Sequence, residues 1–350
     1  MWNLTRLQTV LLVSMVIPLA GVTMPFTVSM SGGEDGHHQW QQIAEPYSFD
    51  FISWELHALP SLPKEILGEQ GKSSQEAKLR SQIKIVLKEK GIAAFPPIMF
   101  SLEKPPHLLV LSSRDKIVYL HRTMLRQELG VEEMEKLEAQ IDELDFSSLV
   151  VELGGFGATY PTIVSDSLSI VNTIDTVVEE WLHQYLAFKP LGFLYLLDSV
   201  GIKPDLEVVT MNETLAGMVS EEIGAEVYTR YYRDQEEIKA DRNVSTFDFD
   251  AEMRETRREV DSYLSQGKIE EAERYMEERR KEFVAHGYHI RKLNQAYFAF
   301  HGIYGQDPAS VSPISGDLQQ LRATSSLLRD FLDEVAAMKS YAELKQALEK

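Results

Sequence analysis

The chain has 350 residues, enough to bury a sizeable hydrophobic core as one large domain or two small ones. Its formal net charge of −19 argues against a nucleic-acid partner, because phosphate binding needs a basic surface. The absence of cysteine excludes disulfides and thiolate-bound metals, so any metal must be held by His, Asp or Glu.

The N-terminal segment is apolar. No residue is charged from Leu7 to Gly33, which is long enough for a transmembrane helix of about 20 residues. Arg6 precedes this segment and Glu34 and Asp35 follow it, so the positive-inside rule places the bulk of the chain outside the cytoplasm. We therefore predict a membrane-anchored, extracytoplasmic protein. The alternative is a cleaved signal peptide and a secreted protein.

Residues 31–38 have the composition of a linker. The aromatic stretch at 47–56 is expected to dock the N-terminal segment onto the main body. A capping box of Ser73 and Glu76 then predicts a helix that runs to about Lys90, where Gly91 follows.

The middle of the chain has short β-like runs. The predicted strands are 97–101, 107–112 and 116–120, of which the last two form a hairpin, and 148–153. An acidic surface helix is expected at 130–144, before the fourth strand. The glycine cluster at 154–157 lacks the Lys-Ser/Thr ending of a phosphate loop, which favours a flexible edge or loop beside a cleft.

From Ser165 onward the patterns are mainly helical. Alternating Arg and Glu predict an exposed antiparallel hairpin of helices over 250–264 and 269–285, and 318–348 supplies two amphipathic segments. We therefore predict an α+β protein that is mainly α. Its parts are the segment 1–36, an N-terminal α/β part at 37–146, and a mainly helical part at 147–350 with the hairpin at 250–285.

One candidate metal site lies on a helix predicted over Asp175–Leu186. Glu179 and His183 are four residues apart, so their side chains project from one face of that helix about one turn apart. Two ligands at this spacing can hold the same metal ion. Glu180, next to the first of them, can reach a water molecule bound to that metal and act as the general base.

A second motif follows 30 residues after His183, where Asn212 precedes Glu213. Together the two motifs resemble those of the gluzincin (thermolysin-like) zinc metallopeptidases, most closely a group of bacterial membrane-associated predicted aminopeptidases. The resemblance implies a helical metallopeptidase core in which Glu213 is the third metal ligand. This chain departs from the family pattern at its first ligand, where Glu179 replaces a histidine.

The same resemblance implies roles for two other segments. In thermolysin-like folds an edge strand near the metal helix pairs with extended substrate, and the glycine cluster at 154–157 suits that role. An aromatic run, Arg291–Gly305, is similar to the run that closes the catalytic domain of these proteins. From it, Tyr297 and His301 are the candidates to stabilise the oxyanion.

The ligand set Glu179, His183 and Glu213 predicts a divalent metal. Zinc is expected from the resemblance, while the two carboxylates also admit Mn²⁺ or Fe²⁺. The expected function is a membrane-anchored metallopeptidase that hydrolyses a peptide or protein substrate. The alternatives are a non-catalytic relative that binds at the membrane surface, and a helical adaptor, which predicts that the site residues lie far apart.

Overall fold

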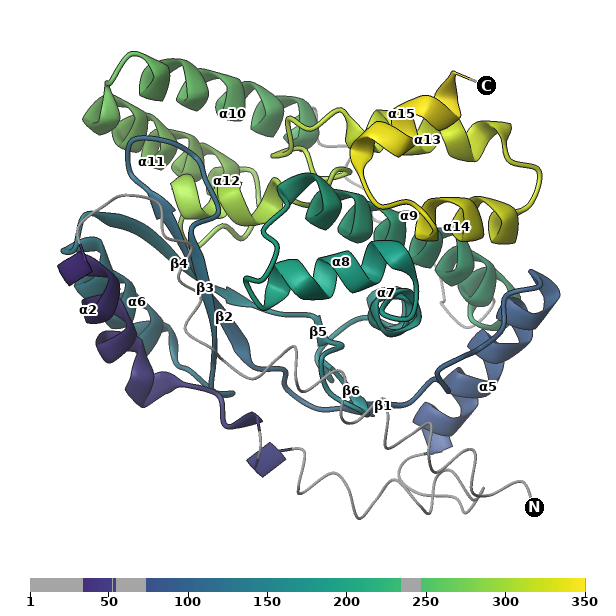
Figure 1. The fold of residues 1–350 in the computed structure, drawn as a ribbon. Coiled ribbons are helices and arrows are strands. Elements are labelled where there is room, and N and C mark those ends of the chain that lie inside the picture. Colours follow the sequence, from purple (N-terminus) through teal and green to yellow (C-terminus); the bar gives the residue numbers. More distant parts are fainter. Residues whose placement is uncertain (1–33, 52, 55–73, 234–246, 350) are drawn as a thin grey trace.

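The computed structural model describes residues 34–51, 53–54, 74–233 and 247–349 (Figure 1). This part of the chain is α+β and mainly helical, as predicted, with two three-stranded sheets. The predicted membrane segment lies outside the described residues. None of the helices described here is long and apolar enough to cross a membrane.

The first sheet is antiparallel and is buried on both faces. Its central strand β2 (His107–Ser113) pairs with β3 (His121–Leu125) on one side and with β4 (Phe146–Glu152) on the other. Successive side chains of a strand point to opposite faces. Leu109 and Leu111 therefore pack against α2 (Glu34–Ala44) and α6 (Val131–Asp142), while Leu108 and Val110 pack against α12 (Gln295–His301). Figure 1 shows α2 and α6 beside the sheet.

Two predicted features of this region differ in the structure. The strand expected at 116–120 is a loop, and β3 begins only at His121. The hydroxyl of Ser112 accepts a hydrogen bond from the Val118 N–H and donates one to the Lys116 carbonyl, which holds the chain in a turn there. The predicted linker at 31–38 is helical from Glu34 onward, where α2 begins.

Residues 34–51 dock onto the main body, as the aromatic stretch predicted at 47–56 implies; residues 52, 55 and 56 of that stretch lie outside the described residues. After α2 and the short helix η1 (Glu45–Tyr47), Ser48 forms a β-bridge with Leu125. The rings of Phe49 and Phe51 then lie about 6 Å from the ring of Phe156, at 6.1 and 5.9 Å between centroids. This contact joins the segment to the edge of the second sheet.

The second sheet consists of β1 (Phe100–Leu102), β6 (Thr162–Val164) and β5 (Gly155–Phe156). β5 pairs with β6 only, so the predicted glycine-rich edge is confirmed. Helix α5 (Ser74–Glu89) precedes this sheet and ends at Gly91, whose φ of +74° is a conformation that favours glycine. The cap predicted at Ser73 lies outside the described residues.

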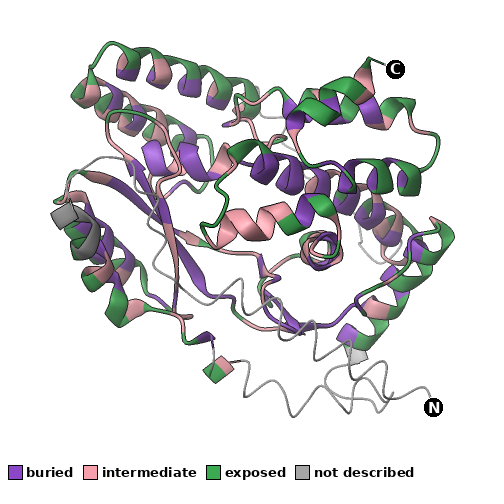
Figure 2. Ribbon diagram, viewed as in Figure 1, coloured by how far each residue is buried: buried purple, intermediate pink, exposed green. Residues whose placement is uncertain are grey.

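The helical part is built around α7 (Ile170–Leu186) and α9 (Leu206–Tyr231), which are buried along most of their lengths (Figure 2). Both contribute to the largest hydrophobic core, which also includes α8 (Pro190–Ser199). The C-terminal region forms three helices instead of the two expected: α13 (Ile314–Thr324), α14 (Leu328–Ala336) and α15 (Tyr341–Leu348). Trp181 anchors α7 by donating from its indole N–H to the Pro96 carbonyl at 2.8 Å.

The predicted helical hairpin is confirmed as α10 (Phe249–Ser265) and α11 (Ile269–Ala285). The guanidinium of Arg279 on α11 pairs with Glu252 on α10 at 2.5 Å. Arg114, in the loop between β2 and β3, pairs with Glu273 at 2.8 Å and so joins the hairpin to the first sheet.

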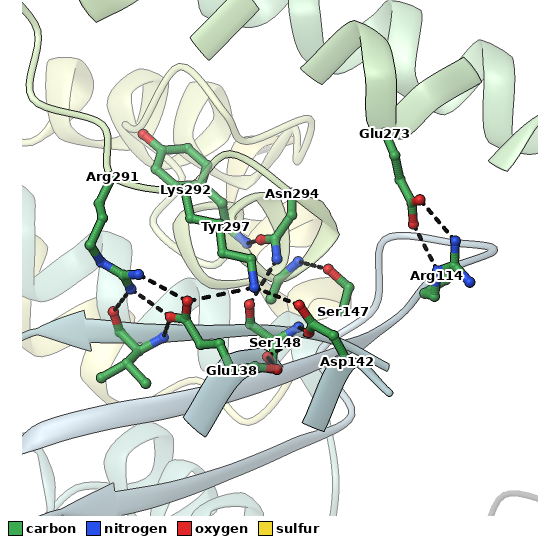
Figure 3. A network of polar contacts seen from close by, with 12 residues as sticks. Arg114, Glu138, Asp142, Ser147, Ser148, Glu273, Arg291, Lys292, Asn294 and Tyr297 are labelled. Atoms are coloured by element: carbon green, nitrogen blue, oxygen red, sulfur yellow. Dashed lines mark hydrogen bonds and ion pairs between the residues drawn. The ribbon is translucent and has the colours of Figure 1, made fainter. Parts of the chain in front are cut away.

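The segment after the hairpin returns to the first sheet through a polar network (Figure 3). Arg291 forms two hydrogen bonds with the buried carboxylate of Glu138 on α6, at 2.9 and 2.5 Å, and Lys292 pairs with Asp142 at 2.8 Å. The amide of Asn294 donates to the Ser148 carbonyl on β4 and caps α12. Because of these contacts, α12 lies against β2 and β4 and brings the residues after it to the same region as α7 and α9.

We expect Glu138→Ala to lower the free energy of unfolding by about 3 kcal/mol, because it leaves the Arg291 charge without its buried partner. The Val150 N–H, which donates to Glu138 at 2.6 Å, also loses its acceptor. Denaturant unfolding measures the change. Gln140→Ala, an exposed residue on the same helix, is the control and should change stability by about 0.5 kcal/mol or less. Equal effects of the two substitutions would contradict the role of the network.

Candidate metal centre

Three side chains from two helices converge beside the core. Glu179 and His183 project from α7 and Glu213 projects from α9, and each offers a ligand atom within 4.8 Å of the others. The two helices meet through their apolar residues, and these polar groups line the cleft beside that contact. Glu213 is buried, and Glu179 and His183 are half-buried. This group can bind a metal ion.

The imidazole of His183 is held by three neighbours. Its Nδ1 lies 2.9 Å from the Oδ1 atom of Asn212, which can only accept, so Nδ1 carries a proton and Nε2 is the nitrogen that faces the site. Nε2 faces the carboxylate of Glu213 at 3.4 Å. The ring of Tyr195 on α8 stacks on the imidazole, with centroids 5.7 Å apart, and its hydroxyl donates to Glu213 at 2.8 Å.

Glu180 lies against the glycine-rich edge strand. A Cβ atom at Gly155 or Gly157 would come within 2.5 Å of a Glu180 carboxylate oxygen, so only glycine admits this side chain at both positions. The N–H of Gly157 donates a hydrogen bond to the carboxylate. Gln184, one turn further along α7, donates to the carbonyls of Gly157 and Thr159 and holds the loop in place.

The three acidic groups and the imidazole perturb one another. Burial raises the pKa of Glu179 to about 7 and that of Glu180 to about 8, although the nearby His183 acts in the opposite direction. Burial alone would lower the pKa of His183, but the carboxylates of Glu213, Glu180 and Glu179 outweigh it and raise that pKa to about 10. Burial alone would raise the pKa of Glu213, but the pairing with His183 and Tyr195 outweighs it and lowers that pKa below the ordinary value.

The site opens into a cleft of about 800 Å³. Its walls come from α7, α8, the end of α12 and the segment after it, strands β2 to β4, the edge strand β5, and residues of α2 and the stretch that follows it, up to Ser48. Glu179, Glu180, His183 and Glu213 all line it. The helical-adaptor alternative expected these four residues to lie far apart, whereas the structure places them together.

The two aromatic candidates lie in different places. His301 lines the cleft, and its Nδ1 lies 2.9 Å from a carboxylate oxygen of Asp307. Tyr297 is not among the cleft-lining residues and packs against His301 instead, with ring centroids 4.1 Å apart and the ring planes tilted by 31°. Tyr304, seven residues later, does line the cleft, where burial and the charges of Glu213 and Glu179 raise its pKa well above the ordinary value.

Sequence reasoning missed several polar residues of this cleft, among them Tyr195, Tyr304 and Arg122. Tyr304 was within the aromatic run, but only Tyr297 and His301 of that run were singled out as candidates. α12 in fact ends at His301, and the turn that follows directs Tyr304 into the cleft. Tyr195 and Arg122 stand in segments whose sequence carries no motif, so only the tertiary contacts identify them.

Comparisons of the chain with protein-family models, with curated proteins and with solved structures found no match. The gluzincin resemblance therefore rests on the two motifs and on the geometry just described.

The donor set fits a divalent cation. Two carboxylates and one imidazole nitrogen are ligands that zinc, manganese and iron accept. The hydrogen bond to Asn212 orients the imidazole, and the one from Tyr195 orients Glu213, in the way that outer contacts orient ligands in metal sites. Burial raises the pKa of Glu179, and the neighbouring carboxylates raise that of His183, so the site favours positive charge and a bound cation would supply it.

Proposed function

We propose that this protein is a metal-dependent peptidase with a gluzincin-like site, and that zinc is its metal, with Mn²⁺ or Fe²⁺ as alternatives. The single observation that carries the proposal is the convergence of Glu179, His183 and Glu213 within 4.8 Å in a cleft that also contains Glu180. This is the constellation that the two sequence motifs imply. A membrane-anchored, extracytoplasmic location remains part of the proposal and depends on residues 7–33.

Glu179, His183 and Glu213 would hold the ion, which supplies a Lewis acid beside the scissile carbonyl. Glu180 would take a proton from the attacking water as its oxygen adds to the carbonyl carbon. The same side chain would then pass that proton to the amide nitrogen, so that the C–N bond breaks and an amine leaves. In the metal-free protein burial raises the pKa of Glu180 to about 8, and a bound cation would lower it toward neutrality, where a carboxyl group can both take and give a proton.

Two further residues have roles in this proposal. The hydroxyl of Tyr304 would donate a hydrogen bond to the negative charge that develops on the carbonyl oxygen, and its raised pKa keeps that hydroxyl protonated. The edge strand at Gly155 and Phe156 has one side without a strand partner among the described residues, where extended substrate can pair.

Metal removal tests the proposal. The full chain, purified without added metal, should contain about one equivalent of a divalent metal by elemental analysis. It should release new amino termini from a pool of synthetic peptides followed by mass spectrometry. A strong chelator should abolish that activity, and one equivalent of zinc should restore it.

The control is a parallel chelation of the His183→Ala variant, which should not recover with zinc, because one of the three ligands is missing. A chain that carries no metal and binds none on addition would favour the non-catalytic alternative at the membrane surface.

A further inference from the structure

The cleft contains one cationic side chain for which the mechanism above has no use. Arg122 lies on β3 opposite Val110 of β2, and paired residues of neighbouring strands share a face. Its side chain is therefore on the face that carries α12 and the cleft, whereas its neighbour His121 is buried against Trp40 on the other face. The side chain of Arg122 remains 24% exposed, enough for its guanidinium to meet a bound molecule.

The contacts of Arg122 position its guanidinium without using up its donors. An Nη2 atom lies 3.9 Å from a carboxylate oxygen of Asp198 on α8, a distance beyond hydrogen-bond range. Asp198 itself accepts a hydrogen bond from the backbone N–H of Asp205 at 2.8 Å. Tyr119 packs against the guanidinium with 5.7 Å between its ring centroid and Cζ, and its hydroxyl accepts one hydrogen bond from it. A guanidinium has five N–H groups in a fork that matches a carboxylate.

Arg122 is a cation in a cleft whose other charged residues are mostly acidic. In the part of the chain that the structure describes, Arg122 is the only arginine or lysine that lines the cleft. Five glutamates share the same walls: Glu45, Glu152, Glu179, Glu180 and Glu213. Apart from the proposed metal ion, Arg122 is the point of this surface that would attract an anionic group of a ligand, whereas the glutamates would repel it.

Arg122 is also connected to the metal site. Tyr195, whose hydroxyl donates to Glu213, lies three residues before Asp198 on α8 and hence on the same face of that helix. The charge of Arg122 contributes to the lowered pKa of Glu213. The guanidinium is therefore close enough to act on a substrate group near the scissile bond.

We propose that Arg122 is a specificity-determining residue that binds a carboxylate of the substrate next to the cleaved bond. This inference rests on the proposed peptidase function. The carboxylate is either the free C-terminus of a peptide or an acidic side chain, and both have the same chemistry. It differs from the aminopeptidase mode that the resemblance implies, in which acidic residues of the cleft would bind the N-terminal ammonium group.

Binding to the Glu180→Gln variant of the full chain tests the inference, since this variant should not consume the probe. The probes are N-acetyl-Ala-Ala-Ala as the free acid, the same peptide as its amide, N-acetyl-Ala-Glu-Ala amide, and unblocked Ala-Ala-Ala amide. Isothermal titration should show about tenfold tighter binding of the free acid or of the glutamate peptide than of the blocked trialanine amide. A preference for the free acid identifies the C-terminus, and a preference for the glutamate peptide identifies an acidic side chain.

Addition of Arg122→Gln should remove that tenfold preference while the affinity for the blocked amide stays the same. Arg122→Lys keeps the charge but not the fork and should retain part of the preference. Arg126→Gln is the matched control, because Arg126 pairs with Glu133 and does not line the cleft. A purely structural arginine would change the melting temperature but not the ratio of the two affinities.

Three results would overturn the inference: equal binding of all probes, a free-acid preference that persists in Arg122→Gln because the metal binds the carboxylate, or tightest binding of the unblocked amide. Titrations of the chelated protein separate the two proposals. One outcome is an Arg122-dependent preference of the chelated protein for carboxylate probes, in a chain that shows no metal binding and no hydrolysis. That result supports the carboxylate site and rejects the peptidase function. Hydrolysis that does not depend on Arg122 supports the peptidase function and rejects the carboxylate site.

Discussion

Glu180→Gln should reduce peptide hydrolysis by about 10³-fold and leave the metal content unchanged. Glutamine has the same size as glutamate and fits between Gly155, Gly157 and α7, but it cannot take a proton from water. The three ligand positions remain intact, so elemental analysis should still find about one equivalent of metal. The initial rate of cleavage of a pooled peptide substrate, measured for both proteins side by side, gives the effect.

Glu207→Gln is the control for this experiment, because Glu207 is exposed at the start of α9 and away from the cleft. Its activity should match that of the unmodified chain. If Glu180→Gln were as active as this control, Glu180 would not be the general base, and the activity would come from another group or from a contaminating peptidase.

The stability of the metal-free protein should fall by about 3 kcal/mol between pH 5.5 and pH 8. Glu179 and Glu180 have an ordinary pKa of 4.5, which the fold raises to about 7 and about 8. In this window the folded state therefore holds more protons than the unfolded state, and the free energy of unfolding decreases as the pH rises. His183 acts in the same direction: its contribution is complete below about pH 6.5 and is lost as the pH rises through about 10.

Denaturant unfolding of the chelated protein at the two pH values measures this slope. The double variant Glu179→Gln, Glu180→Gln should lose most of it, whereas Glu207→Gln should keep it, which separates the site from the general repulsion within an acidic chain. Saturation with zinc should reverse the slope, because ligands bind the ion in their deprotonated forms. An unchanged slope in the double variant would show that these two carboxylates titrate normally.

Much of the fold could be predicted because local patterns decided it. The helical hairpin follows from alternating charges and a polar turn at 265–268, and the end of α5 follows from Gly91. The strand expected at 116–120 could not be corrected from sequence. Its residues have β propensity, but the Ser112 hydroxyl bonds to the backbone of that segment and holds it as a loop. A pattern of residue types does not predict such a side-chain contact.

The metal site, too, could be predicted from the sequence only in part. The i, i+4 spacing of Glu179 and His183 is a property of one helix, and the sequence alone is sufficient to place both on one face. That Glu213 reaches the same point depends on how α7 packs against α9, which the motif pair implied only by resemblance.

By itself the sequence determined the acidic character of the chain, the absence of thiolate ligands, the main helices and the four residues Glu179, Glu180, His183 and Glu213 as one candidate site. Only the tertiary structure decided which other side chains share the cleft. Tyr195, Tyr304 and Arg122 come from three separate elements, and Tyr297 is not among the cleft-lining residues. The physical reason is that helical and strand periodicity fix which face of an element a residue occupies, whereas long-range packing fixes what that face meets.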